Sequence, residues 1–260
     1  MDLGIRGKKA LIGGASKGLG LAAAQALAAE GCEVAIVSRS RENLEAARRK
    51  FPSPQAVHPI VADLATSDGV DACIRQADLW ASVDILVNNT GGPPPGRSMQ
   101  LDDDAWRRAN ESLVLYVKKM CDHFVPPMRA RKWGRVVTIT SLTVREPVEN
   151  LVLSNVYRAG LTAYLKGLAR EVAADGVTVN SVLPGAYLTE RYAQLIEGTM
   201  RTSGRSREDV TAELLSRFPQ SRFQQPEELG AVVAFLASAK ATAVTGAAVP
   251  AEGGMLRGMW

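Results

Sequence analysis

The sequence has few of the residues that usually build metal and disulfide sites. Only 2 of its 260 residues are histidine, and its 3 cysteines are far apart, without a C-x-x-C pair. This spacing argues against a disulfide framework and against a structural metal site. Because unpaired cysteines are usually core residues, we expect free buried thiols at Cys32, Cys73 and Cys121, and no metal.

Long apolar runs and a strong net charge are also lacking. No run approaches the ~20 apolar residues that span a bilayer, and the N-terminus enters a strand pattern at Lys9 without a signal peptide. The 31 basic and 27 acidic residues are intermixed and leave a net charge of +4, which argues against nucleic-acid binding. We expect a cytoplasmic protein with no membrane and no nucleic-acid partner.

Short β-type runs alternate with longer amphipathic segments along the whole chain. With 46% hydrophobic and 22% charged residues, the composition is that of a globular protein, and we expect residues 1–260 to form one domain. Alternation of this kind specifies a parallel sheet. We predict a Rossmann-like α/β fold, a doubly wound parallel seven-stranded sheet with helices on both faces.

The expected strands are Lys9–Ile12, Glu33–Val37, Val57–Val61, Asp84–Val87, Arg135–Ile139, Thr178–Val182 and Ala247–Val249. Helical spacing is found, for example, in Gly20–Glu30, Arg41–Lys50, Asp103–Met128, Ser154–Ala174 and Glu227–Ser238. Two stretches, Gly91–Gln100 and about 190–222, read as irregular. Both follow strand C-termini, where open α/β sheets bind ligands, so we expect a substrate wall from the first and a substrate loop or lid from the second.

A glycine-rich turn follows the first predicted strand and has the spacing G-x-x-x-G-x-G. Glycine lets the backbone turn tightly and approach a pyrophosphate closely, and the helix that follows offers free N–H groups at its N-terminus. We therefore predict a dinucleotide-phosphate site at this turn, formed by Gly14, Ser16, Lys17, Gly18, Leu19 and Gly20.

This turn resembles that of the short-chain dehydrogenase/reductase family, and more particularly of 3-oxoacyl-[acyl-carrier-protein] reductases. Further landmarks match in order over nearly the whole chain: Asp63-Leu64, Asn88-Asn89-Thr90-Gly91 and Pro184-Gly185. The resemblance implies cofactor contacts from Asp63 and Leu64 at the adenine, Asn89 and Gly91 at the adenosine side, and Pro184, Gly185 and Tyr187 near the nicotinamide. Thr90 replaces the usual alanine.

The second predicted strand is followed by Ser38-Arg39, where an acidic residue would select NAD by binding the ribose 2′-hydroxyl. Arg39, with Lys17 from the glycine turn, would instead give positive charge and donors to a 2′-phosphate, and Ser38 adds a hydroxyl. We predict NADP(H) as the cofactor. The alternative is that both basic side chains are solvated and select nothing.

The family's catalytic Tyr-x-x-x-Lys is missing from this chain. Ser141 ends a strand that resembles the family's catalytic-serine strand, and Ala159-Gly160-Leu161 matches what ordinarily follows the lysine. In that register, Ser154 occupies the tyrosine position and Arg158 the lysine position, at i and i+4 on one helical face. The family's helper asparagine position falls at Leu113, with Asn110 about one turn earlier.

The replacements change the expected chemistry. Arg158 can still bind the ribose but is a poor proton relay, since guanidinium does not deprotonate. Ser154 is far less acidic than a phenol, whose pKa is ~10. Tyr157 is a substitute candidate, although it lies about 60° around the helix and would more simply pack elsewhere. Tyr187 is a second candidate.

Two functions follow from this resemblance. The first is an NADP(H)-dependent oxidoreductase acting on a small carbonyl or secondary alcohol, with a 3-oxoacyl thioester as one option. The alternative is a catalytically weak or inactive NADP(H)-binding regulator or supporting subunit.

The resemblance further implies a homodimer or homotetramer built through Asp103–Met128, Ser154–Ala174 and Leu256–Trp260, with Trp260 as an anchor. A basic cluster of Arg129, Arg131 and Lys132 could meet an acyl carrier protein, but Asp175 would lie near it and lower its charge. The alternative for this cluster is ordinary solvated surface.

Overall fold

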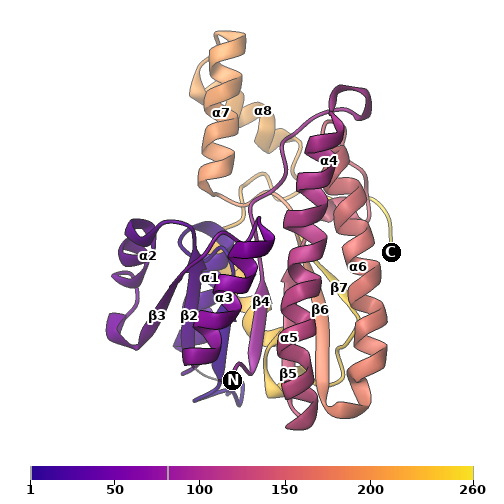
Figure 1. Ribbon diagram of the computed structural model, residues 1–260. Coiled ribbons are helices and arrows are strands. Elements are labelled where there is room, and N and C mark those ends of the chain that lie inside the picture. Colours follow the sequence, from indigo (N-terminus) through magenta and orange to yellow (C-terminus); the bar gives the residue numbers. More distant parts are fainter. Residues whose placement is uncertain (1, 81, 260) are drawn as a thin grey trace.

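The sheet predicted from the alternation of strands and helices is present in the computed structural model, which describes residues 2–80 and 82–259 (Figure 1). In these ranges seven strands pair in parallel, in the order β3-β2-β1-β4-β5-β6-β7. The strands are β1 Lys9–Ile12, β2 Glu33–Ser38, β3 Val57–Val61, β4 Ile85–Asn88, β5 Gly134–Ile139, β6 Val177–Pro184 and β7 Ala248–Ala251. The predicted fold class is confirmed.

The helices connect consecutive strands or extend above the sheet. They are α1 Gly18–Ala29, α2 Arg41–Arg48, α3 Ser67–Trp80, α4 Asp103–Asn110, α5 Tyr116–Ala130, α6 Val152–Val172, α7 Glu190–Ser203, α8 Arg207–Ser216 and α9 Pro226–Leu236. In the described part of the chain, no helix is long and apolar enough to cross a membrane.

Two apolar cores lie on opposite faces of the sheet. Successive strand residues alternate between them, as a pleated strand requires: Ala10 and Ile12 belong to the core under α1, α2 and α9, and Leu11 to the core under α3, α5 and α6. Helices α1 and α9 approach closely at Gly230, where an added Cβ would lie 2.7 Å from the Ala22 carbonyl oxygen. Both faces are therefore covered, and the carboxyl edge of the sheet is where loops gather.

The long helix predicted over Asp103–Met128 is interrupted. A π-helical turn, Glu111–Leu115, separates α4 from α5. The hydroxyl of Thr90 donates a hydrogen bond to the Ser112 carbonyl oxygen within this turn, at 3.2 Å. A donor from outside the helix that binds a helix carbonyl is a common accompaniment of such a bulge. The threonine at position 90, where the family usually has alanine, therefore bonds to the π-helical turn.

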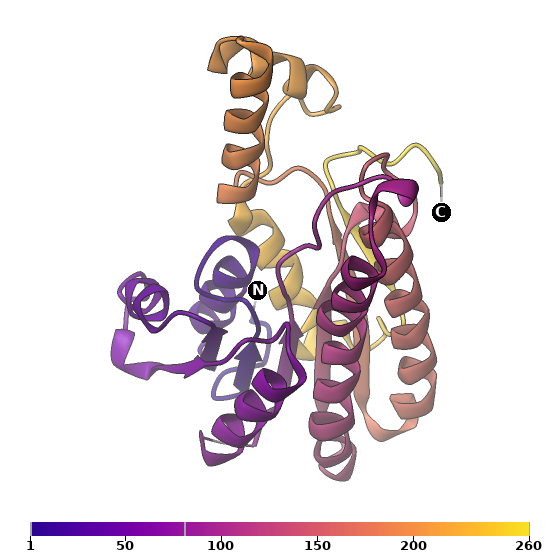
Figure 2. The same cartoon turned by 45° about the horizontal axis from the view of Figure 1, so that its top comes forward.

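The stretch expected to be irregular, about 190–222, is mostly helical, and that expectation was wrong. Helices α7 and α8 stand apart above the sheet (Figures 1 and 2). Gly204 ends α7 with a φ of +68°, and the Ser206 hydroxyl caps α8 by accepting from the Asp209 N–H. Both helices pack on a small apolar core, which stabilises them as helices. Its buried residues are Ala186, Ile196, Val210, Phe218 and Phe223.

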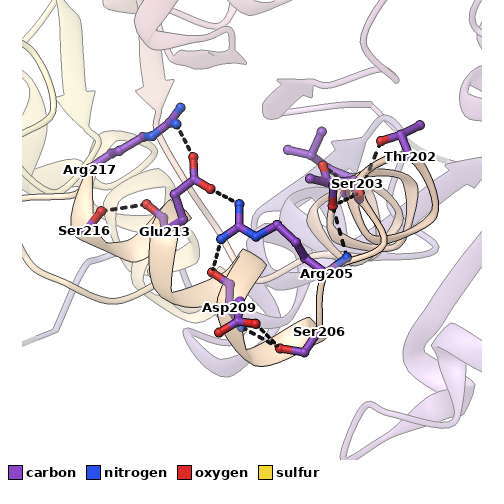
Figure 3. Close-up of polar contacts among 10 residues, drawn as sticks. Thr202, Ser203, Arg205, Ser206, Asp209, Glu213, Ser216 and Arg217 are labelled. Carbon is purple, nitrogen blue, oxygen red and sulfur yellow. Dashed lines mark hydrogen bonds and ion pairs between the residues drawn. The ribbon is translucent and has the colours of Figure 1, made fainter.

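Charged side chains hold the turn between α7 and α8 against α8 (Figure 3). Arg205, in the turn between them, pairs with Glu213 and also donates to the Asp209 carbonyl oxygen at 3.2 Å. Glu213 binds Arg217 as well, and these guanidinium partners, Arg205 first, hold the pKa of the Glu213 carboxyl below its usual range. The pairs are exposed, so each adds little stability, but together they fix the turn.

The loop Gly91–Gln100 runs along the start of α6. The Gly96 N–H donates to the Asn150 carbonyl oxygen at 2.7 Å, and Gly96 bridges Leu151. Arg97 adds an ion pair with Glu149. This segment is therefore held beside the start of α6. The predicted anchor Trp260 lies outside the described residues.

Candidate active site

Two adjoining clefts open at the carboxyl edge of the sheet and meet at residues 14 and 89–92. The first, of about 520 Å³, has Ser141, Thr143, Ser154 and Arg158 among the polar side chains of its lining, and is called the hydroxyl cleft below. The second, of about 400 Å³, contains Arg39 and is called the Arg39 cleft. Together they form one elongated groove across the strand ends, which suits a dinucleotide and a small substrate.

The glycine turn lies where the clefts meet, and Asn89 holds its shape. The amide nitrogen of Asn89 donates to the carbonyl oxygens of Gly13 and Gly14, at 3.2 and 3.3 Å. Gly14 has a φ of +55°, and a Cβ on Gly20 would lie 2.4 Å from the Gly14 oxygen, so neither position accepts another residue without strain. The structure assigns Asn89 to support of the turn.

Helix α1 begins at Gly18, and no side chain caps its first turn. Its N-terminal N–H groups therefore remain available, with the positive end of the helix dipole behind them. Leu19, Pro184 and Gly185 line the hydroxyl cleft beside this turn. A Cβ on Gly185 would lie 2.8 Å from Glu252, so the wall here has to be bare backbone.

The Arg39 cleft brings together most of the residues expected around an adenosine. Ser38, Arg39, Asp63 and Leu64 all line it. The Ser16 hydroxyl donates to the Ser38 hydroxyl at 2.9 Å, which joins the glycine turn to the end of β2. The carboxylate of Asp63 accepts from the Ala65 N–H at 3.1 Å, so one of its oxygens holds its own turn.

Lys17 lies elsewhere than expected. It lines the hydroxyl cleft, and its ammonium is 3.0 Å from the carboxylate of Glu190, the first residue of α7. The second basic residue of the Arg39 cleft is instead Arg108 of α4. Sequence reasoning missed Arg108, because the chain places it 69 positions after Arg39 and only the fold brings them together.

The hydroxyl cleft contains three of the four residues predicted for catalysis, Ser141, Ser154 and Arg158. Ser141 follows β5, and its hydroxyl oxygen accepts from the Thr143 N–H at 3.2 Å. Ser154 and Arg158 lie one turn apart on α6, exposed by 7% and 8%. The Ser154 hydroxyl lies 3.1 Å from that of Thr143, and Arg158 donates to the Ile139 carbonyl oxygen at 3.2 Å. A buried cation thus lies beside three buried or half-buried hydroxyls.

The two tyrosines considered as substitutes serve other contacts. Tyr157 packs edge to face on Trp106 of α4, with ring centroids 5.7 Å apart, in an apolar cluster with Ala105, Ala109 and Leu153, and it is not part of the cleft lining. Tyr187 does line the cleft, but its hydroxyl donates to the Ala251 carbonyl oxygen at 2.9 Å. Burial raises the pKa of Tyr187 to about 12, which makes this phenol a poor acid.

The helper position gives no replacement either. Leu113 is 2% exposed in the π-helical turn, and Asn110 ends α4 without lining either cleft. Residues that sequence reasoning missed in the hydroxyl cleft are Thr143, Tyr192 and Met255. Of these, Thr143 had a signal, since it stands two residues after Ser141 at the end of a strand.

Comparison with known proteins decides the family. A family model described as enoyl-(acyl carrier protein) reductase matches residues 14–256. The 3-oxoacyl-[acyl-carrier-protein] reductase FabG of Escherichia coli (strain K12) is 32% identical over 254 residues, covering 97% of this chain and 99% of the relative. The chain belongs to the short-chain dehydrogenase/reductase family. The predicted membership is thus confirmed.

Solved structures agree with this result. L-sorbose reductase from Gluconobacter frateurii, complexed with NADPH and L-sorbose, has a TM-score of 0.94 and 34% identity, with full coverage of both chains. A 3-oxoacyl (acyl-carrier-protein) reductase from Agrobacterium tumefaciens C58, with NADP bound, has a TM-score of 0.87 and 26% identity, over 97% of this chain and 96% of that one. Both contain the cofactor type predicted from Ser38-Arg39.

The remaining predictions concern thiols and metals. Cys32, Cys73 and Cys121 are free and buried, as expected. Within residues 2–80 and 82–259 no three histidine, cysteine or acidic side chains gather as a metal site would need.

Proposed function

We propose that this protein is an NADP(H)-dependent oxidoreductase that interconverts a small carbonyl compound and its secondary alcohol. The observation that carries the proposal is the gathering of Ser141, Ser154 and Arg158 in a cleft continuous with a dinucleotide-shaped groove. Bound NADPH would supply the hydride for the carbonyl carbon. The proton for the carbonyl oxygen comes from solvent through a hydroxyl of the cleft.

The cofactor assignment rests on charge and shape. The uncapped N-terminus of α1 offers N–H donors for a pyrophosphate, and Arg39 with Arg108 makes the Arg39 cleft basic, as a 2′-phosphate requires. The relatives solved with NADPH and NADP support the same choice. Arg158 takes the ribose-binding role, because it stays charged at every physiological pH.

The substrate class is narrowed by the cleft walls. The lining combines several hydroxyls with the apolar side chains of Leu142, Val148, Leu151 and Met255, so a small polar carbonyl with an apolar portion fits best. L-sorbose and a short 3-oxoacyl thioester are the first compounds to test, given the relatives that act on such molecules. The basic cluster is less useful for a carrier protein, because Arg129 and Lys132 both bind Asp175, at 2.7 and 2.5 Å.

The experiment measures NADPH consumption with a panel of ketones, sugars and 3-oxoacyl thioesters, beside NADPH and NADH titrations. We expect turnover of at least one compound and a loss of about 10²-fold or more in Ser141→Ala, the cost of removing one donor to the developing oxyanion. Equal affinity for NADH and NADPH would contradict the cofactor assignment. Turnover unchanged by Ser141→Ala would contradict the site assignment.

The second candidate is a cofactor-binding regulator or supporting subunit. It is favoured by the replacement of both the tyrosine and the lysine, since a proton donor of that kind is worth ~10²–10⁴ in rate. Tight NADPH binding without consumption of any carbonyl would select this function.

We also propose a homodimer or homotetramer through α4, α5 and α6. Leu115 and Val156 are 41% and 48% exposed there, and apolar surface on neighbouring helices favours association. Light scattering tests this assembly, and a monomer at micromolar concentration would refute it.

A further inference from the structure

Thr143 has hydrogen bonds to both serines of the hydroxyl cleft. It lies in the short turn Leu142–Val144 that follows β5, and it is 3% exposed. Its backbone N–H donates to the Ser141 hydroxyl oxygen at 3.2 Å, and its side-chain hydroxyl lies 3.1 Å from that of Ser154. All three residues line the hydroxyl cleft. Thr143 thus joins β5 to α6 at the centre of the site.

These bonds constrain where the serine protons point. A hydroxyl has one proton to donate and two lone pairs to accept with. Because the Ser141 oxygen accepts from the Thr143 N–H, its own proton is left for another acceptor. If Thr143 donates to Ser154, the same holds there, and both serines present an O–H to the cleft. The side chain of Thr143 is branched at Cβ and so has few rotamers, which makes it a firm support.

We propose that Thr143 is a positioning residue that orients the Ser154 hydroxyl, and through its N–H the Ser141 hydroxyl, toward the carbonyl oxygen of the substrate. The inference rests on the proposed function and deepens it. Two donors that are already oriented stabilise a developing oxyanion more than donors that have to reorient during the reaction. The site would then replace a single acidic phenol with a preorganised pair of weaker donors.

The first test compares two substitutions of Thr143. Thr143→Val keeps the shape and the backbone N–H but removes the hydroxyl, and Thr143→Ser keeps the hydroxyl. We expect T143V to lower kcat about 10-fold, below the 10²–10³ that follows loss of a whole oxyanion donor, with the KM for NADPH unchanged. We expect T143S to restore most of the rate, which a purely structural role of the methyl group would not allow.

A matched control exists at the other end of the sheet. Thr178 at the start of β6 is 5% exposed, and its hydroxyl has no hydrogen-bond partner among the residues described. Thr178→Val therefore makes the same chemical change in the core without touching the cleft. We expect its kcat to equal that of the wild type.

The second test is a double-mutant cycle with Ser154→Ala. If Thr143 acts through Ser154, adding T143V to S154A should cause little further loss of kcat, because interacting residues are not additive. A T143V protein as fast as the wild type would overturn the inference. So would full additivity with S154A, or a T143S protein as slow as T143V.

Failure of the proposed function gives a different pattern. If the wild type turns over no compound of the panel, the proposed function is refuted independently of the role of Thr143. The role of Thr143 is then tested by measuring ketone binding. L-sorbose and each panel ketone are then titrated into protein loaded with NADP⁺. Thr143 is still supported if T143V weakens ketone binding while T143S and Thr178→Val do not. Equal binding by all variants, or binding by none, overturns it.

Discussion

Restoring the missing phenol at residue 154 is the sharpest test of how this cleft works. In Ser154→Tyr/Arg158→Lys, a tyrosine enters from the same helical face as the serine, into a cleft of about 520 Å³. The two substitutions remove the hydrogen bond between Ser154 and Thr143 and the bond from the Arg158 guanidinium to Ile139, at a cost of about 1 kcal/mol in stability for each. The cleft has room for the ring, so we expect the variant to fold and to bind NADPH.

The expected gain comes from acid catalysis. A positioned general acid contributes ~10²–10⁴ in rate, which is about 2.7–5.5 kcal/mol of barrier. Leu113 occupies the helper position and is buried, so the lower end applies and we expect about a 10²-fold rise in kcat. Ser154→Tyr alone should raise kcat less than the double substitution does. Arg158 is bulkier than lysine, and its hydrogen bond to the Ile139 carbonyl oxygen holds it away from the new tyrosine.

The assay follows NADPH absorbance with the best ketone of the panel from pH 6 to pH 10. The matched control is Ser154→Phe/Arg158→Lys, which adds the ring without the hydroxyl and should show no gain. Since a phenol must be protonated to act as an acid, the gain should disappear as the pH rises through the pKa of the new tyrosine. The reasoning fails if the phenylalanine variant is equally fast, or if a folded, NADPH-binding tyrosine variant is no faster than its parent.

Three further outcomes are expected. Arg39→Ala should weaken NADPH binding about tenfold or more and leave NADH binding unchanged, since one charge-assisted hydrogen bond is lost. The control is Arg49→Ala, at the exposed end of α2. If fluorescence titrations show that both variants lose the same NADPH affinity, the assignment of Arg39 to the cofactor cleft is refuted. Arg135 is 1% exposed and donates to the carbonyl oxygens of Gly134, Gly176 and Ser238. Arg135→Ala should lower the free energy of unfolding, measured in urea, by roughly 3 kcal/mol, because buried acceptors are left unpaired. An unchanged free energy of unfolding would contradict this prediction. Burial raises the thiol pKa of all three cysteines to about 12, so the reactive thiolate is absent at pH 8. A thiol reagent should therefore label the protein only as it unfolds. Rapid labelling of the native state would contradict this prediction, because it would show that the thiols are accessible.

Local pattern was enough to predict most of the fold. The periods of the apolar residues predicted the strands and helices of the sheet, and Gly14, Gly18 and Gly20 predicted the tight turn before α1, because both features depend on neighbouring residues only. The register of Ser154 and Arg158 also followed from adjacent residues. Each of these predictions uses information that lies within one or two turns of chain.

Contacts between distant segments were not predictable in this way. The pairing of Lys17 with Glu190 joins residues 173 positions apart, so no local pattern could place Lys17 away from the Arg39 cleft. The bond between Thr143 and Ser154 crosses from a strand end to a helix. Helices α7 and α8 are a different case. Gly204 and Ser206 are recognisable stop and start signals for helices, but the abundance of arginine, serine and threonine in this stretch obscured them.

The packing of α6 has a consequence for how such proteins can change. Residues 154 and 158 face the cleft, while Leu161, Leu165 and Ala169 hold the same helix against the sheet. The residues proposed to act in the reaction and the residues that pack the helix against the sheet are therefore separate sets. Mutations at residues 154 and 158 leave the packing residues of α6 intact. The proton donor can therefore be replaced during evolution while the protein remains folded. A library randomised at 154 and 158 should accordingly be rich in folded proteins.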